Sequence, residues 1–532
     1  MTHLLQRYAT SQAATRPDAI GIIAGKRTLT YAQLEEQSNQ LAHLILQSGC
    51  KRGDRVCLFL NKSPSAVVAM HAIMKADCVY VPIDISSPPT RVQRIVESCR
   101  PRLILADSSA IKLLNAVLAG MAKNQRPVVG CMDSTAIETD ECKSSFDASD
   151  LHHMKATAPD SSNGPDDPVH ILFTSGSTGT PKGVVLSHRN VTHFIDWIRE
   201  YLGITSDDKL SGHPPLHFDL STLDIFATIS AGAQLHMVPA MANLLPNLMA
   251  KFIRDSELTQ WLSVPSALTL MARSDAVGEN DFPCLRRLIW GGETFPTPTL
   301  IHWMNRLPHV QFTNLYGPTE TTIASSYYTV PKCPTDPLQQ IPIGQACDGE
   351  ELSVLDAKLN AVPQGTQGDL YISGQGLSLE YWEDPNKSAE VFLTTGDTPS
   401  SGKIYRTGDL AYVGDDGLFY FLGRNDSQIK SRGYRIELGE IETAMNALGT
   451  LKDCAVIGVP TGGFEGTAIC CAFVPETDDG VSPETLRSNA SKLLPSYMIP
   501  TRWQCFGSLP KTGNGKTDRR KLKELFESEI TN

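Results

Sequence analysis

The chain has 532 residues, more than one hydrophobic core usually serves, so two or more domains are expected. Its formal net charge of −11 argues against non-specific nucleic-acid binding, which needs basic surface, and against attraction to anionic membranes. The N-terminus lacks the pattern of a secretory signal, and no apolar run is long enough to span a bilayer. The 13 cysteines are odd in number and form no C-x-x-C pair, which favours free thiols in a reducing cytoplasm over disulfides or structural zinc.

Helical and strand-like patterns alternate along the first 110 residues. Thr30 and Gln33 form a capping-box pattern before an apolar helical stripe that Gly49 ends. This alternation predicts an α/β fold whose large N-terminal domain has mostly parallel sheets flanked by helices. Further strand and helix patterns follow at 55–60, 66–75, 78–82 and 102–106.

A polar stretch at 138–167 interrupts this alternation. It is rich in Ser, Asp, Pro, Asn and Gly, and a strand pattern resumes directly after it. We therefore interpret it as a surface excursion within one large domain, 1–425.

A second boundary is expected at the polar turn 423–426. Beyond it, apolar residues keep helical spacing from Leu438 to Leu448, and two strand patterns follow at 454–459 and 468–474. These elements predict a small α+β C-terminal domain over 426–532.

A loop rich in glycine and hydroxyl side chains follows the buried-strand pattern at 169–173. It reads TSGSTGTPKG, to which the Walker pattern cannot be fitted. Glycines let backbone amides converge on an anion, hydroxyls donate hydrogen bonds and a lysine adds charge, so the loop predicts phosphate binding. The candidate phosphate-binding residues are Thr174, Ser175, Gly176, Ser177, Thr178, Gly179 and Lys182.

This loop resembles the signature of the adenylate-forming superfamily, which includes acyl-CoA synthetases, firefly-type luciferases and the adenylation domains of nonribosomal peptide synthetases. The resemblance covers essentially the whole chain. It implies an enzyme that joins a carboxylate to the α-phosphate of ATP, with release of pyrophosphate and with Mg²⁺ as the metal ion. The further matching motifs are VYVPID at 79–84, YGPTET at 316–321, YRTGDL at 405–410, GRNDSQIKSRGYRIE at 423–437 and PKTGNGKTDR at 510–519.

The resemblance also implies roles at the ATP site. Lys516 is the implied catalytic residue, a cation brought from the small domain to the carboxylate and the phosphate. Asp409 is implied to accept the ribose hydroxyls with support from Arg424, Tyr316 to stack on adenine, and Glu320 to bind Mg²⁺. The other residues implied to line the ATP site are Gly292, Glu293, Thr294, Asn314, Gly317, Thr319 and Phe421.

Members of this superfamily use two arrangements of their domains, so the small domain is expected to be mobile. Asp426 matches the hinge position, where a few residues at the ends of elements absorb the rotation. Gly433 lies in the segment that faces the thiol tunnel after that rotation.

A second motif, LHFDLS at 216–221, predicts which acid is activated. Its Asp219 matches the aspartate that pairs with the α-ammonium in amino-acid adenylation domains, because a buried carboxylate needs a cationic partner. An N-cap for the following helix is the other interpretation of Asp219. The rest of the pocket carries no charge and selects by shape. The Asp-Leu-Leu start of the pocket lining resembles that of freestanding prolyl ligases that load carrier proteins, which implies L-proline first and another small apolar amino acid next. The candidate substrate-binding residues are His217, Phe218, Asp219, Leu220, Leu223, Leu262, Ile289, Gly291, Leu315, Ile323 and Ala324.

The expected acceptor of the acyl group is the phosphopantetheine thiol of a separate carrier protein, with coenzyme A less favoured. The chain ends 16 residues after Lys516 without a carrier segment. An acyl- or aryl-CoA ligase, a D-alanine–carrier protein ligase and a non-catalytic protein on the same fold stay open as alternatives. The stretch 85–91, ISSPPTR, departs from the usual family pattern, and we expect altered loop packing there, outside the chemistry.

Overall fold

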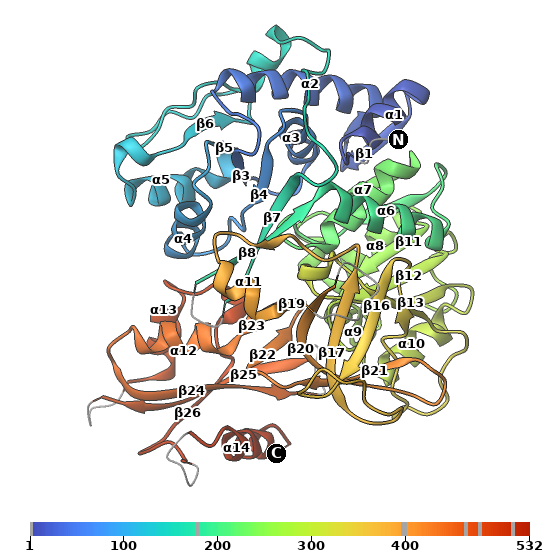
Figure 1. Cartoon of the computed structure of the whole chain (residues 1–532), viewed down its shortest axis with the longest axis vertical. Coiled ribbons are helices and arrows are strands. Elements are labelled where there is room, and N and C mark those ends of the chain that lie inside the picture. The colour runs from blue at the N-terminus through green and yellow to red at the C-terminus, as the bar shows by residue number, and fades with distance from the viewer. Residues whose placement is uncertain are drawn as a thin grey trace.

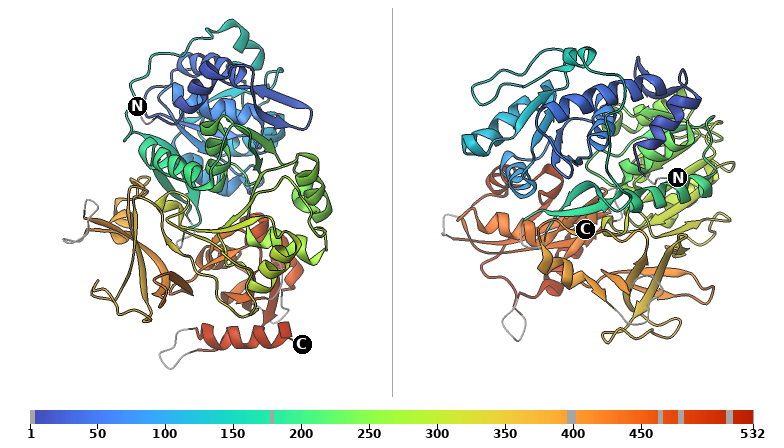
Figure 2. Two further views of the ribbon diagram at one scale, coloured as in Figure 1. Left: turned by 90° about the vertical axis from the view of Figure 1, so that its right-hand side faces the viewer. Right: turned by 45° about the horizontal axis from the view of Figure 1, so that its top comes forward.

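The computed structural model describes residues 4–176, 180–394, 402–461, 466–476, 481–511 and 517–531. The large domain, blue to orange in Figure 1, contains three sheets in the described residues, and the small C-terminal domain, in red, lies at the lower left beside the sheet of β17 (Gly368–Gly374), β20 (Lys403–Val413) and β21 (Phe419–Arg424). The view turned by 90° in Figure 2 shows the same order, with the N-terminal helices at one end and the C-terminal helix at the other.

The first sheet has nine strands and is parallel through its centre. The N-terminal hairpin joins it far from its neighbours in sequence, because Ile22 pairs with Leu235 in the parallel register of β1 and β10. In spatial order its strands are β15 (Gln345–Ala346), β14 (Ser326–Thr329), β13 (Gln311–Tyr316), β12 (Arg287–Gly291), β11 (Gln260–Ser263), β9 (Lys209–Gly212), β10 (Gln234–Met237), β1 (Ile20–Ala24) and β2 (Arg27–Thr30).

The second sheet has seven strands, of which β7, β4, β3, β5 and β6 are parallel. Strand β8 returns antiparallel to β7 after the predicted phosphate loop. In spatial order the strands are β18 (Glu380–Tyr381), β8 (Lys182–Ser187), β7 (Pro168–Thr174), β4 (Val79–Pro82), β3 (Arg55–Phe59), β5 (Leu103–Ala106) and β6 (Val128–Cys131).

Helices pack on both faces of these two sheets and form alternating layers. One apolar core holds a central helix layer between the sheets, and two further cores hold a helix layer on each outer face. Side chains of successive residues along a strand enter different cores, as Cys57 and Leu58 do on β3. The central layer contains α1 (Arg7–Thr15), α2 (Tyr31–Gln47), α3 (Pro64–Lys75), α6 (His188–Leu202) and α7 (Leu220–Ala231). The outer layers contain α4 (Pro89–Cys99) and α5 (Ile111–Ala119) on the second sheet, and α8 (Pro246–Asp255), α9 (Pro265–Arg273) and α10 (Thr297–Arg306) on the first.

The third sheet of the large domain is antiparallel throughout. It carries the YRTGDL motif on its long strand β20 and ends where the predicted hinge begins. Its elements are β16 (Glu350–Leu355), β17 (Gly368–Gly374), β19 (Phe392–Thr394), β20 (Lys403–Val413) and β21 (Phe419–Arg424), and helix α11 (Pro385–Val391) precedes β19.

In its described residues, the small C-terminal domain combines a two-stranded hairpin, a three-stranded sheet and three α-helices. Its own apolar core contains side chains of α12 and α13 together with strands β24 and β25. Its elements are β22 (Gln428–Ser431), β23 (Tyr434–Glu437), α12 (Leu438–Asn446), β24 (Leu451–Pro460), β25 (Thr467–Pro475), α13 (Pro483–Ala490), β26 (Arg502–Cys505) and α14 (Arg519–Thr531).

The predicted fold class is confirmed. Its local basis also holds at α2, where the Gln33 amide donates to Thr30 Oγ1 at 3.2 Å and the Thr30 amide donates to Gln33 Oε1 at 3.0 Å. The boundary between 425 and 426 stays a prediction. Among the described residues, no helix combines the length and apolarity needed to cross a membrane.

Candidate active site

A cavity of about 110 Å³ lies where the strand ends of the two large sheets, the antiparallel sheet and the small-domain hairpin meet. Carboxyl ends of parallel strands are the usual ligand-binding edge of such sheets. The predicted site residues in its walls are Thr174, Ser175, His217, Phe218, Asp219, Gly292, Gly317, Thr319, Asp409 and Arg424. Residues that the sequence placed in separate motifs, up to 250 positions apart, therefore surround one space.

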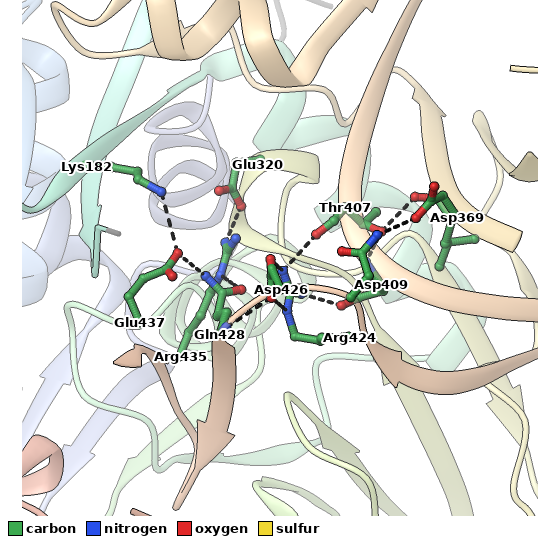
Figure 3. A network of polar contacts seen from close by, with 12 residues as sticks. Lys182, Glu320, Asp369, Thr407, Asp409, Arg424, Asp426, Gln428, Arg435 and Glu437 are labelled. Atoms are coloured by element: carbon green, nitrogen blue, oxygen red, sulfur yellow. Dashed lines mark hydrogen bonds and ion pairs between the residues drawn. The ribbon is translucent and has the colours of Figure 1, made fainter. Parts of the chain in front are cut away.

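Asp409, the predicted ribose acceptor, is held from two sides. The Tyr316 hydroxyl donates to one of its carboxylate oxygens, and the Arg424 guanidinium pairs with the other. Figure 3 shows how Arg424 also reaches Asp426 and the carbonyl of Thr407. Asp409 is thus fixed in orientation as an acceptor at the cavity wall.

The ring of Tyr316, predicted to stack on adenine, faces the small domain. Lys430 Nζ lies 5.8 Å from its centroid, and the ring of Phe421 lies 6.3 Å away. Burial lowers the pKa of Lys430, although the carboxylate of Asp409 raises it.

The described part of the phosphate loop continues β7 and returns along β8, with Thr174 paired to Lys182. Gly176 has no room for a side chain, because a Cβ there would collide with the carbonyl oxygen of Thr180. Ser175 Oγ donates to the carbonyl of Arg435 at 2.7 Å. Ser177, Thr178 and Gly179 lie outside the described residues.

Glu320, the predicted magnesium ligand, is buried with 1% of its side chain exposed. It accepts hydrogen bonds from the Tyr381 hydroxyl and from Arg435 Nη1, both at 2.6 Å. Burial raises the pKa of this carboxyl, but the charge of Arg435 and the hydrogen bonds from Tyr381 and Arg435 together outweigh burial and lower the pKa of Glu320 to about 2.

The surroundings of Glu320 fit an ion that is shared with phosphate oxygens. Glu320 already pairs with one cation, the guanidinium of Arg435. Within the described residues no group of three His, Cys, Asp or Glu side chains could hold a metal ion by itself. A single carboxylate suffices for Mg²⁺ only when a substrate phosphate supplies further oxygens.

Asp219 stands at the N-terminus of α7 but does not cap it, so the N-cap interpretation is wrong. Its Oδ2 instead accepts a hydrogen bond from Thr319 Oγ1 at 2.7 Å, across the cavity edge. Burial raises the pKa of Asp219, and the bond from Thr319 partly offsets that rise. A cationic group bound beside it would relieve the desolvation of this carboxylate.

The apolar residues predicted around the substrate side chain lie together in the central core. Gly291 sits among them, and a Cβ there would lie 3.1 Å from the carbonyl oxygen of Leu315 and 3.8 Å from Leu220 Cδ2. None of these residues is among those that line the cavity in the described structure. The buried members are Leu220, Leu223, Leu262, Ile289, Leu315, Ile323 and Ala324.

The remaining predicted ATP-site residues differ in their contacts. Glu293 accepts from the amides of Gly433 at 2.7 Å and Ser266 at 3.1 Å, and Gly292 has a left-handed φ of +87° beside the cavity. Asn314 Nδ2 donates to the carbonyl of Pro342 at 3.0 Å. The side chain of Thr294 is exposed.

Lys516, the predicted catalytic residue, lies outside the described residues. The two described residues on either side of it, Lys511 and Thr517, form an isolated β-bridge. Lys511 Nζ also pairs with Asp453 Oδ2 at 2.8 Å on β24 of the small domain.

Among the cavity-lining residues to which the sequence gave no role are Arg91, Lys430, Arg435 and Tyr497. Lys430 and Arg435 lie inside the motif at 423–437, and their positive charge is the signal that could have identified them as site residues. Arg91 belongs to the 85–91 stretch, and the expectation that this stretch lies outside the chemistry is wrong for it. Tyr497 stacks on Tyr434 with ring centroids 3.6 Å apart, and nothing in its local sequence indicated that contact.

Comparisons with known proteins match both parts of the chain. The family model for the AMP-binding enzyme matches residues 9–382, and that for the AMP-binding enzyme C-terminal domain matches residues 440–516. Surfactin synthase subunit 2 of Bacillus subtilis is 33% identical over 96% of this chain, but the chain spans only 14% of that protein.

Two further proteins match over nearly their full length. The L-proline–[L-prolyl-carrier protein] ligase of Pseudomonas fluorescens is 31% identical over 99% of this chain and 98% of its own. The adenylation domain AlmE of Vibrio cholerae, solved in complex with glycyl-adenosine-5′-phosphate, superposes with a TM-score of 0.86 at 25% identity, over 99% of this chain and 98% of its own.

Proposed function

Because this chain belongs to the AMP-binding enzyme family of the adenylate-forming superfamily, we propose that it activates an amino acid with ATP and transfers it to a thiol. The first step forms aminoacyl-AMP and pyrophosphate. The second forms a thioester with the phosphopantetheine arm of a separate carrier protein. The observation that carries the amino-acid class is Asp219, a carboxylate at the cavity edge that neither caps its helix nor has an ion-pair partner among the described residues.

In the first step a carboxylate oxygen of the amino acid attacks the α-phosphorus of ATP, and the bond to the β-phosphate oxygen breaks. Asp219 holds the α-ammonium, which places the carboxylate toward Thr174 and Ser175 across the cavity. Asp409, fixed by Tyr316 and Arg424, accepts the ribose hydroxyls. Bound at Glu320, Mg²⁺ would neutralise charge on the phosphate oxygens.

Lys516 is proposed to supply the positive charge that stabilises the developing negative charge at the α-phosphate. In the second step the thiol sulfur attacks the acyl carbon, the bond from that carbon to the AMP oxygen breaks, and AMP leaves. A carrier protein is favoured over coenzyme A because the prolyl ligase relative acts on a carrier protein.

L-Proline is the proposed substrate, with another small apolar amino acid next. The apolar residues packed around Gly291 support a compact uncharged side chain. The relatives support the same size range, since one is a prolyl ligase and another was solved with a glycyl adenylate. A D-alanine–carrier protein ligase also fits this size range. The acid substrate of an acyl-CoA ligase has no ammonium group that could pair with the charge of Asp219.

Pyrophosphate exchange tests the substrate class. We expect proline to give the highest rate, valine and alanine to follow, and glutamate and lysine to fail because no pocket residue pairs with their charges. Matched acids that lack the amine should exchange at least about a hundredfold more slowly, because they leave the Asp219 charge unpaired. A des-amino or fatty acid as the best substrate would overturn the amino-acid assignment.

Asp426 gives a separate test of domain movement. Its carboxylate pairs with Arg424 at 2.6 Å directly after β21, at the junction of the two domains. Asp426→Pro should restrict the backbone there, so adenylation and thioester formation should lose unequal shares of their rates. Exchange and aminoacyl-thioester assays measure the two steps, and Asp426→Asn controls for loss of the ion pair alone. Equal losses in both steps would count against a hinge.

A further inference from the structure

Three groups predicted to bind the triphosphate and its metal ion are occupied by one segment of the small domain, residues 435–440. Lys182 Nζ lies 3.6 Å from Glu437 Oε1, and the Gly176 amide lies 3.4 Å from Glu440 Oε2. Arg435 pairs with Glu320 at 2.6 Å. Figure 3 shows the pairs of Lys182 and Glu320 side by side, each joined to a residue near the end of β23.

The charged groups of residues 435–440 are arranged like those of a metal-bound polyphosphate. Two carboxylates face an ammonium and a backbone amide, groups that would donate hydrogen bonds to phosphate oxygens. One guanidinium faces the carboxylate that is predicted to hold the cation. The contacts are shielded from solvent, with Lys182 and Glu437 only 14% and 8% exposed. Arg91 and Gln428 hold the two carboxylates in place, as Gln428 Nε2 donates to Glu437 Oε1 at 2.7 Å and Arg91 pairs with Glu440.

We propose that residues 435–440 compete directly with magnesium pyrophosphate, and with the β- and γ-phosphates of ATP, for the phosphate loop and Glu320. Glu437 and Glu440 take the place of phosphate oxygens, and Arg435 takes the place of the cation. A polyphosphate can bind these donors only after the segment withdraws. The segment can return only after pyrophosphate has left, so its return prevents pyrophosphate from rebinding and reversing the first step. This proposal rests on the proposed function, since it assumes that the site binds ATP.

The direction of the expected change in affinity follows from this competition. The apparent affinity of a ligand equals its intrinsic affinity multiplied by the fraction of the protein that is in the binding-competent arrangement. Weakening a competing contact raises that fraction and must therefore tighten binding. Glu437→Gln and Glu440→Gln keep the shape of each side chain but remove its charge. Each variant should bind magnesium pyrophosphate about threefold to tenfold more tightly, and the double variant more tightly still. Most substitutions at a binding site weaken binding, so a gain in affinity separates competition from structural damage.

The experiment titrates the full chain with magnesium pyrophosphate by calorimetry, without amino acid or carrier. Glu442→Gln is the matched control, because Glu442 lies on the same helix as Glu440 but pairs with Arg519 inside the small domain. That variant should bind with the affinity of the unmodified protein. Unchanged or weaker binding by Glu437→Gln and Glu440→Gln, with the control normal, would overturn the competition.

A second readout follows the withdrawal itself. Cys284 of the large domain and Cys505 of the small domain are the exposed cysteines in the structure, so spin labels placed on them report the distance between the domains. Magnesium pyrophosphate should change this distance, and in the double variant it should do so at a lower concentration. No change at saturating pyrophosphate would also overturn the proposal. If pyrophosphate binds neither the unmodified protein nor any variant, the proposed use of ATP is refuted. If pyrophosphate binds normally but the variants show no gain in affinity, only the proposed competition is refuted.

Discussion

Asp219→Ala should lower amino-acid activation by several hundred-fold or more. The carboxylate is desolvated at the cavity edge and receives a hydrogen bond from the neutral hydroxyl of Thr319, so the substrate ammonium is its expected charge partner. Removing one member of such a pair typically costs roughly 3–5 kcal/mol, because the other charge stays buried without compensation. The measurement is kcat/KM for pyrophosphate exchange with proline.

Des-amino acids supply the internal control for this variant. They have no ammonium to lose, so Asp219→Ala should leave their low activity unchanged or raise it by removing an unpaired charge. Thr319→Val removes only the hydroxyl that orients Asp219, and a smaller loss is expected from it. A uniform loss for amino acids and des-amino acids alike would mean that Asp219 supports the structure of the pocket and does not pair with substrate.

Lys516→Ala should reduce adenylate formation about a hundredfold to a thousandfold while the protein stays folded. A donor positioned for charge that develops in the transition state contributes about that much to the rate. Pyrophosphate exchange measures the loss, and the thermal unfolding midpoint checks the fold. Transfer to the carrier thiol from added, chemically synthesised aminoacyl-AMP should be much less affected, because the adenylate is then already formed.

Lys511 provides the control for Lys516 within the same motif. It pairs with Asp453 on the small domain, so Lys511→Ala removes an equal charge from the same motif without removing the proposed catalytic group. Exchange by this variant should stay within about threefold of the unmodified rate, since exposed ion pairs contribute little. Near-normal exchange by Lys516→Ala would refute its catalytic assignment.

Local sequence signals were sufficient for several elements near both ends of the chain, and many of the motif residues line one cavity. The capping box at Thr30 and the loop after β7 are formed by residues close together in the chain, so their sequence patterns were enough to predict them. The antiparallel sheet around β20 was not predicted. Its strands β17 and β20 pair across a connection that contains β18, α11 and β19, although β20 and β21 form a short hairpin. The roles of Arg435 and Arg91 were missed for a related reason. Their partners, Glu320 and Glu440, lie more than a hundred residues away and are set by how the domains meet.

The pairing of β1 with β10 has a consequence for how the chain is made. Ile22 lies beside Leu235, 213 residues further on, so a ribosome that adds about 5–20 residues per second needs about 10–40 s to deliver the partner strand. Until then the β1–β2 hairpin has an open edge, and an open edge is prone to pair with other chains. Non-local pairing of this kind also slows folding. A nascent chain stopped before β10 should therefore leave its first thirty residues undocked and sensitive to protease, and completion of β10 should protect them.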